Sequence, residues 1–193
     1  TGLPLDDAMR LRIALLACQP ILGLGLDCYA AFGSVIVYPD AFVVRDREYV
    51  DEDGVVHRGD DVLTGEAWEQ GPVLVSWPDV QASGQGEGYN VVAHEFAHKL
   101  DMLDGAANGF PPLHGGMDPT AWEAAFDAAY DDLSARLDRG EEPWIDPYAV
   151  QDPAEFFAVT SELFFDVPAD LKAEYPAVYG QLARFYRQDP AGT

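Results

Sequence analysis

Two kinds of hydrophobic pattern occur along the chain: short apolar runs between about residues 34 and 77, and helical periodicity elsewhere. The longest periodic stretch begins at Asp118 and Pro119, which suit the N-cap and first position of a helix, and ends before Gly140. Apolar residues recur there every three or four positions, at Trp122, Ala125, Phe126, Ala129, Tyr130, Leu133 and Leu137. This spacing predicts a helix over about 119–139 whose apolar face packs into a core.

Other helices carry their own start and stop signals. Asp6 provides an N-cap and Pro20 a stop for a first helix over about residues 7–19. Asp152 and Pro153 likewise begin a helix that extends to about Phe165. The remaining apolar periodicity predicts helices at about 91–101, 168–175 and 177–187.

Short runs of β-branched and aromatic residues predict strands at 34–38, 41–44, 55–56 and 71–77. Asp51–Gly54 is a turn signal, so we expect a hairpin there, with His57 beside it as a surface residue. The Gly-rich stretch 84–88 is expected to be a loop. The run Val73–Ser76 has two interpretations: an ordinary sheet strand, or the edge of a cleft to which an extended peptide adds.

Strands followed by a series of helices indicate an α+β fold. With 193 residues, 48% of them hydrophobic, the chain can bury a sizeable core, so we expect residues 1–193 to form one domain. Its two cysteines, Cys18 and Cys28, have neither metal-ligand nor redox spacing, which favours a reducing, cytoplasmic location.

The formal net charge of −23 limits the possible partners. Such a surface repels phosphate backbones and anionic lipid, so we expect no nucleic-acid or membrane-surface binding. No apolar stretch approaches the 18 or so residues that a membrane-spanning helix needs.

The sequence His94-Glu-Phe-Ala-His98 lies inside the expected helix over 91–101. Two imidazoles four residues apart face one side of a helix and can share a metal ion, and the adjacent Glu95 can take a proton from water activated by that metal. Asp101, one turn beyond His98, is expected to orient a histidine through a hydrogen bond. The motif therefore predicts a zinc site with a general base.

A catalytic zinc site normally has a third protein ligand and leaves one position for water. The residues alone leave four candidates: Glu155, Glu162, Asp104 and His114. Glu155 has a competing explanation, because a carboxylate three residues after the N-cap Asp152 also stabilises the start of a helix.

Residues 94–101, HEFAHKLD, together with residues 152–158, DPAEFFA, resemble the Mlc titration factor A family of bacterial zinc peptidases. They are more distantly similar to the catalytic domain of anthrax lethal factor. The resemblance implies that Glu155 is the third zinc ligand and that Tyr148, seven residues before it, stabilises an oxyanion. One position departs from the wider pattern: the acidic residue often found four positions after that glutamate is Val159 here.

Taken with the motif, the resemblance implies a zincin-like α+β metallopeptidase domain, a small sheet packed on an active-site helix, with one Zn²⁺ held by His94, His98 and Glu155. Its substrate would be a peptide or protein, with Glu95 as general base. Because the family takes its name from sequestering a transcriptional repressor, the alternative is a regulator that binds such a repressor, with weak or vestigial hydrolysis. Family members usually begin earlier than Thr1, which leaves open the removal of an N-terminal segment.

Overall fold

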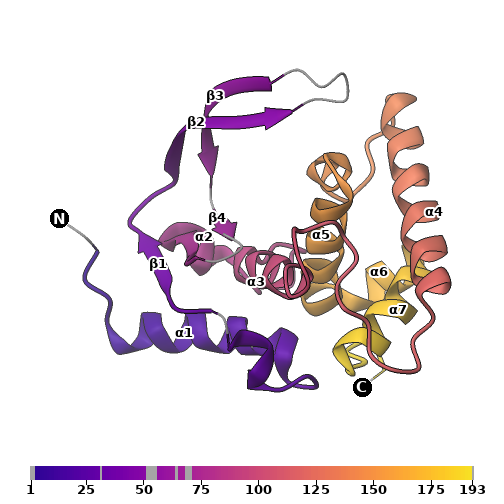
Figure 1. Cartoon of the computed structure of the whole chain (residues 1–193), viewed down its shortest axis with the longest axis horizontal. Helices are drawn as coiled ribbons and strands as arrows, with labels where there is room; N and C mark the ends of the chain where they lie inside the picture. The colour runs from indigo at the N-terminus through magenta and orange to yellow at the C-terminus, as the bar shows by residue number, and fades with distance from the viewer. Residues whose placement is uncertain (1–2, 31, 51–55, 64, 68–70, 193) are drawn as a thin grey trace.

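The computed structural model describes residues 3–30, 32–50, 56–63, 65–67 and 71–192. This part of the chain is α+β and mostly helical, with strands confined to its first 76 residues (Figure 1). None of its helices is long and apolar enough to cross a bilayer.

Helix α1 (Asp7–Cys18) begins as expected, because the side chain of Asp6 accepts a hydrogen bond of 2.8 Å from the backbone N–H of Met9. Met9, Ile13 and Ala17, spaced at four-residue intervals, form its buried side. Two short 3₁₀ helices follow, Gln19–Ile21 and Leu26–Tyr29. The prediction for residues 7–19 is confirmed.

Three strands form a small mixed sheet in the order β1 (Val35–Tyr38), β5 (Val73–Ser76), β4 (Gly65–Ala67). Strand β5 pairs parallel with β1, Val35 opposite Val73, and antiparallel with β4, Gly65 opposite Val75. Each residue of β5 is buried. The interpretation of Val73–Ser76 as a cleft edge is therefore wrong: its continuous apolar run reflects a central strand covered on both faces, and β4 forms the edge of the described sheet.

A second, two-stranded sheet pairs β2 (Phe42–Val50) with β3 (Val56–Leu63), antiparallel with Val43 opposite Val62. Both strands are longer than expected from the sequence. The turn predicted at Asp51–Gly54 and the exposure predicted for His57 lie outside the described residues and side chains. Helix α2 (Trp77–Ala82) occupies positions expected to be strand end and loop; Ser76 caps it by accepting from the N–H of Asp79.

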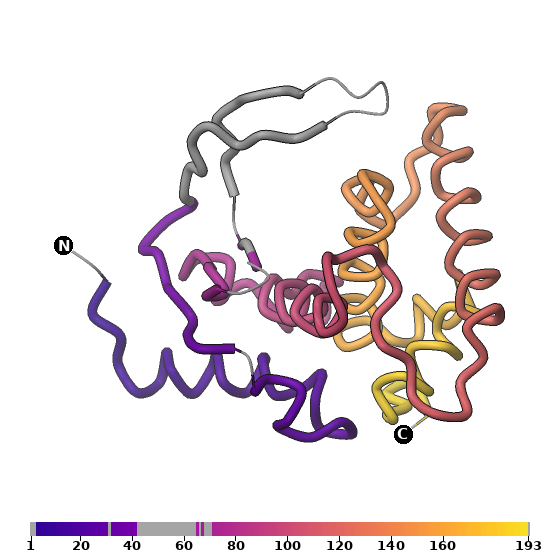
Figure 2. The backbone as a smooth tube through the Cα atoms, viewed as in Figure 1, coloured from indigo at the N-terminus to yellow at the C-terminus, as the bar shows by residue number. Residues whose placement is uncertain are grey.

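Helix α3 (Val91–Asp101) lies between the N-terminal elements and the C-terminal helices (Figure 2). All its residues are buried. Its residue Phe96 joins the cluster that contains Ile13 of α1 and Val75 of β5, whereas Leu100 joins the larger aromatic cluster of the C-terminal helices. The helix is thus held on two sides. A position buried by both clusters suits groups that need low dielectric and fixed geometry.

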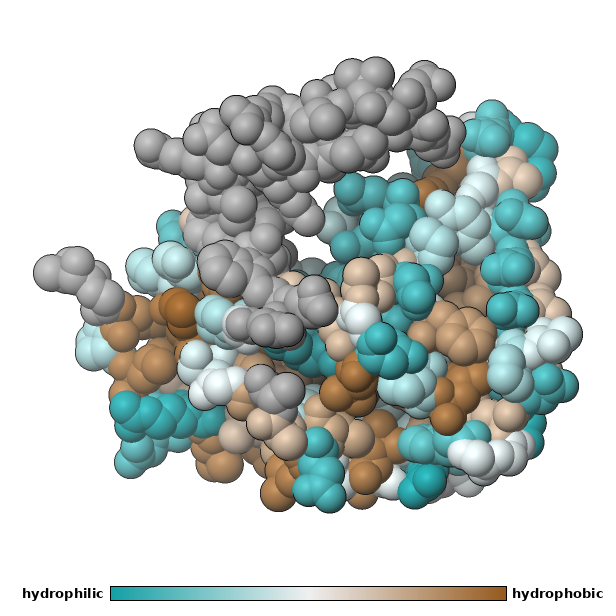
Figure 3. Space-filling model, in the orientation of Figure 1, coloured by the Kyte–Doolittle hydropathy of each residue, from teal (hydrophilic) through white to brown (hydrophobic). Residues whose placement is uncertain are grey.

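The C-terminal part consists of the expected helices and one 3₁₀ turn: α4 (Pro119–Asp138), η3 (Pro147–Val150), α5 (Pro153–Asp166), α6 (Pro168–Glu174) and α7 (Pro176–Tyr186). Helix α5 packs directly against α3. Contacts between aromatic rings link these helices; the ring centroids of Trp122 of α4 and Phe157 of α5, for example, are 5.9 Å apart, with the rings tilted by 54°. Figure 3 shows hydrophilic residues over the outer side of α4 and apolar ones over the α1 region, where Leu11 and Leu15 are exposed.

Candidate metal centre

His94 and His98 face the same side of α3, one turn apart, as their spacing predicts. Both are at least nine-tenths buried, and their Nε2 atoms are 3.2 Å apart. Asn90 caps the helix by accepting from the N–H of Ala93 at 3.0 Å. Burial by the two hydrophobic clusters leaves the imidazole rings little freedom, so the pair is pre-organised.

Glu155, in the first turn of α5, directs its carboxylate at these two rings. Its Oε2 lies 3.0 Å from His94 Nε2 and 3.5 Å from His98 Nε2. Zinc bonds of about 2.0–2.1 Å in tetrahedral geometry place ligand atoms about 3.3–3.4 Å apart. The three distances between the ligand atoms, 3.0, 3.2 and 3.5 Å, lie on either side of this value. In the described part of the chain, Glu155 Oε2 also lacks a hydrogen-bond donor. The three residues are positioned to bind a metal ion.

The carboxylate of Glu155 is not needed to cap α5, because Asp152 provides the cap. Asp152 caps α5 by accepting from the backbone N–H of Glu155 at 2.9 Å, which leaves the Glu155 carboxylate to face the histidines. His114 is engaged elsewhere: its Nε2 lies 2.7 Å from the carbonyl oxygen of Phe185. Neither His114 nor Asp104 belongs to the convergent group.

Glu162 contacts His94 at Nδ1, the ring nitrogen that does not face Glu155 and His98. Its Oε1 is 2.7 Å from His94 Nδ1, and its Oε2 accepts the backbone N–H of Asn90 at 2.7 Å. Because a carboxylate only accepts, Nδ1 carries the proton and Nε2 keeps its lone pair for a metal. Glu162 therefore fixes both the ring and the tautomer of His94.

Asp101 was expected to orient a histidine through a hydrogen bond. This expectation is wrong, because the hydrogen bonds of its carboxylate go to backbone N–H groups. Its Oδ2 accepts the N–H groups of Asn108 and Gly109, at 2.9 and 2.7 Å, and so ties the following loop to the end of α3. His98 Nδ1 and Asp101 Oδ1 are both buried without a partner among the described groups. The orienting role falls to Glu162 instead, which sequence spacing alone did not distinguish from a ligand role.

Glu95 lies beside the two histidines, almost fully buried. Burial raises the pKa of this carboxyl group to about 7, although the neighbouring His94 and His98 lower it. Strand β4 runs directly against it, so closely that a Cβ at Gly65 would overlap Glu95 Oε1. A base with a pKa near neutrality can both accept and return a proton at physiological pH.

In the protein without metal, the contact between His94 and Glu155 moves the pKa values of these two side chains in opposite directions. Burial alone would lower the pKa of His94, but the adjacent carboxylates of Glu155 and Glu162 raise it well above its ordinary value. Burial likewise opposes ionisation of Glu155, yet the two histidines hold its pKa well below the usual range. A metal ion entering the site would displace the imidazole proton, so binding is expected to compete with protons.

Tyr148 lies at the wall of an open cleft beside these residues. The cleft has a volume of about 820 Å³ and is lined by, among others, Gly65, Glu95, Trp144 and Val159. Tyr148 is 42% exposed, and its ring centroid is 6.2 Å from that of His94. The structure thus brings Tyr148, Glu95 and His94 of the convergent group to one cleft. Val159, where the wider pattern has an acid, contributes an apolar side chain to the same wall.

Two histidines on an H-E-x-x-H helix, facing a carboxylate from a second helix, are the kind of site found in metallopeptidases. The family model described as glucose-regulated metallo-peptidase M90 matches residues 1–187, and the chain belongs to this family. It is 46% identical over 192 residues to Mlc titration factor A of Serratia proteamaculans (strain 568), covering 98% of this chain and 72% of that protein. Mlc titration factor A of Yersinia pestis (strain Pestoides F) is 43% identical over 192 residues, with coverages of 98% and 70%. The expected family is confirmed.

Proposed function

We propose that this protein is a zinc-dependent peptidase with a zincin-like fold, formed by residues 1–193 as one domain. The observation that supports this most directly is the convergence of His94, His98 and Glu155 at separations that suit a tetrahedral zinc ion, with a buried carboxylate beside them. A structural zinc site normally closes with four protein ligands. Three ligands beside an open cleft favour a catalytic site.

Zinc held by these residues would lower the pKa of water and polarise the carbonyl of a substrate. Glu95 accepts a proton from the water that attacks the peptide carbonyl carbon, and returns it to the nitrogen as the C–N bond breaks. The phenol of Tyr148 donates a hydrogen bond to the oxyanion that develops on the carbonyl oxygen. Glu162 keeps His94 Nε2 directed at the metal position.

The edge strand β4 offers a place for the substrate chain. Strand β5 occupies one side of β4, and in the described sheet its other side is not paired. An extended peptide can add to such an edge through main-chain hydrogen bonds. Because Gly65 of β4 touches Glu95, a peptide aligned there places a carbonyl near the base.

The test of this function is peptide hydrolysis by the metal-loaded protein and its Glu95→Gln variant. We expect cleavage of members of a mixed peptide library by the wild type, and a loss of turnover of about 10²-fold or more in the variant with metal content unchanged. Equal cleavage by both proteins would remove Glu95 from the role of base. Glu142→Gln, at an exposed residue outside the cleft, is the matched control and is expected to retain full activity.

A second function is suggested by the names of the relatives, Mlc titration factor A, which imply binding to the Mlc repressor. We propose that this chain has a repressor-type protein as partner in addition to peptide substrates. A purified Mlc repressor is the appropriate probe. Binding that Glu95→Gln leaves unchanged, with no cleavage of any library peptide, would assign the protein to regulation rather than hydrolysis. The net charge of −23 disfavours nucleic acid as a partner, and a cytoplasmic location remains our expectation.

A further inference from the structure

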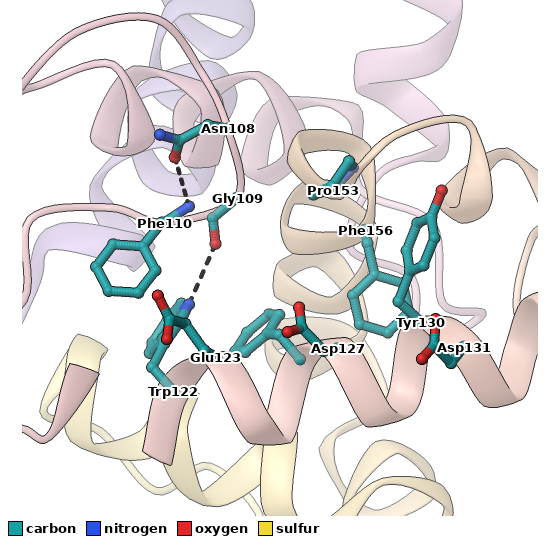
Figure 4. Close-up of a pocket in the computed structure, with 11 residues that line it drawn as sticks. Asn108, Gly109, Phe110, Trp122, Glu123, Asp127, Tyr130, Asp131, Pro153 and Phe156 are labelled. Atoms are coloured by element: carbon teal, nitrogen blue, oxygen red, sulfur yellow. Dashed lines mark hydrogen bonds between the residues drawn. The ribbon is translucent and has the colours of Figure 1, made fainter. Parts of the chain in front are cut away.

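A second pocket lies between α4, the start of α5 and the loop after α3, apart from the candidate metal centre (Figure 4). Its volume is about 290 Å³, roughly that of ten water molecules in the liquid. Helix α5 separates the two sites: Pro153 and Phe156 line this pocket, whereas Val159 and Glu162 line the cleft. A space of this size admits one amino-acid side chain.

Aromatic rings form the floor and walls of this pocket. Trp122 and Phe126 stack with centroids 4.3 Å apart and an interplanar angle of 14°, and Phe156 meets Phe126 edge to face at 6.0 Å. Phe110 and Tyr130 complete the lining on either side (Figure 4). The indole N–H of Trp122 donates to the carbonyl oxygen of Gly109, at 3.2 Å, which holds the loop against α4. The aromatic wall is therefore pre-formed.

The rim is acidic along one face of α4. Glu123, Asp127 and Asp131 follow one another at four-residue intervals, are exposed, and belong to the pocket lining. Like charges at this spacing oppose helix formation. Of the residues lining the pocket, all within the described chain, none is lysine, arginine or histidine.

Among the described residues, no side chain provides a cation for these carboxylates. The basic residue of α4, Arg136, lies beside Glu174 at the far end of the helix and also pairs with Asp132 and Glu141. Across the described residues, no ion pair involves Glu123, Asp127 or Asp131. The described part of the chain thus leaves the three carboxylates open to a cation from another molecule.

We propose that this pocket binds an arginine side chain presented by a peptide or protein partner. A guanidinium group is planar, stacks on aromatic faces and offers five N–H donors to carboxylates, whereas an ammonium group is compact and strongly hydrated. Trp122, Phe126 and Phe156 are buried and form the floor. The partly exposed rings of Phe110 and Tyr130 flank the methylene stem and the plane of the guanidinium, and the carboxylates on the rim neutralise its charge. The site does not depend on the metal centre or on peptide hydrolysis.

The probe is the peptide acetyl-Gly-Gly-Arg-Gly-Gly-amide, added to the ¹⁵N-labelled full chain. Because the Trp122 indole N–H belongs to the pocket wall, its resonance is a site-specific reporter, assigned by its loss in Trp122→Phe. The chain has four tryptophans, so three indole signals serve as internal controls. We expect the arginine peptide to shift the Trp122 signal, the lysine peptide to bind several-fold more weakly, and the uncharged citrulline peptide not to bind.

Two triple variants separate the pocket from general charge attraction, which a chain of net charge −23 exerts on any basic peptide. Glu123→Gln with Asp127→Asn and Asp131→Asn should weaken binding by about ten-fold or more. The matched control removes three exposed carboxylates outside the pocket, by Asp138→Asn, Glu142→Gln and Asp170→Asn, and should change affinity by less than about two-fold. No shift of Trp122 with millimolar peptide, equal weakening by both triples, or equal binding of the lysine or citrulline peptide would overturn the proposal.

Discussion

Replacing Glu95 by Gln should stabilise the metal-free protein, increasingly so as the pH rises. The side chain is almost fully buried, and burial raises the pKa of its carboxyl group from 4.5 to about 7. Between these two pH values the folded state holds a proton that the unfolded state has lost. Stability of the wild type therefore falls as the pH rises from 4.5 to about 7, and this penalty persists at higher pH. Glutamine does not ionise, so the variant avoids the penalty.

The size of the effect follows from the shift. Each pKa unit corresponds to about 1.4 kcal/mol, so the full penalty is about 3 kcal/mol, most of which develops between pH 5 and pH 8. Urea unfolding at several pH values in this range, with a chelator present, gives the free energy of unfolding of both proteins.

Glu142→Gln is the control for this experiment, because that glutamate is exposed and outside the cleft. Its difference from wild type should stay near zero across the range. A stability difference between wild type and Glu95→Gln that does not grow with pH would refute the reasoning that a buried, desolvated carboxylate lies beside the histidines. A growing difference would show that the protein trades stability for a base that titrates near neutrality.

Four further substitutions test other contacts. Gly65→Ala places a methyl carbon within reach of Glu95 Oε1, so we expect turnover to fall by about ten-fold or more while metal content stays unchanged; unchanged kinetics would contradict the close approach. Glu162→Ala removes the partner of His94 Nδ1 and should weaken zinc binding by about 10–100-fold in a chelator competition, in contrast to an unaltered affinity if that contact is incidental. Tyr148→Phe should lower kcat by about 10²-fold at unchanged metal content, and a normal kcat would exclude the oxyanion role. Asp101→Ala leaves two loop N–H groups without their acceptor and should lower the free energy of unfolding by about 1–3 kcal/mol in urea, without direct loss of metal; equal stability would mean that water replaces the carboxylate.

The helices and the histidine pair were predictable because their signals are local. Caps at Asp6, Asp118 and Asp152 are each confirmed by a hydrogen bond to a backbone N–H within the next three residues, and such bonds depend on a few neighbouring residues only. The spacing of His94 and His98 fixes their relative position once the helix forms. In both cases the sequence separation is one turn or less.

What the sequence did not reveal depends on contacts between distant segments. Glu162 and Glu155 lie on one face of α5, and only the packing of α5 against α3 shows that one approaches His94 Nδ1 and the other Nε2. Strand β4 has no β-branched residue, so its place at the sheet edge follows from its pairing with β5 and not from propensity. The same holds for the second pocket, whose walls come from three separate segments.

The central claim is that His94, His98 and Glu155 together bind one metal ion, and metal analysis tests it most directly. Wild type and Glu155→Ala are loaded with zinc side by side, dialysed, and measured by mass spectrometry, with Glu142→Gln as control. The account predicts about one zinc ion per chain in the wild type and in the control, and a clear loss in Glu155→Ala with the fold intact by circular dichroism. Equal zinc in Glu155→Ala and wild type, or no zinc in the wild type, would contradict it.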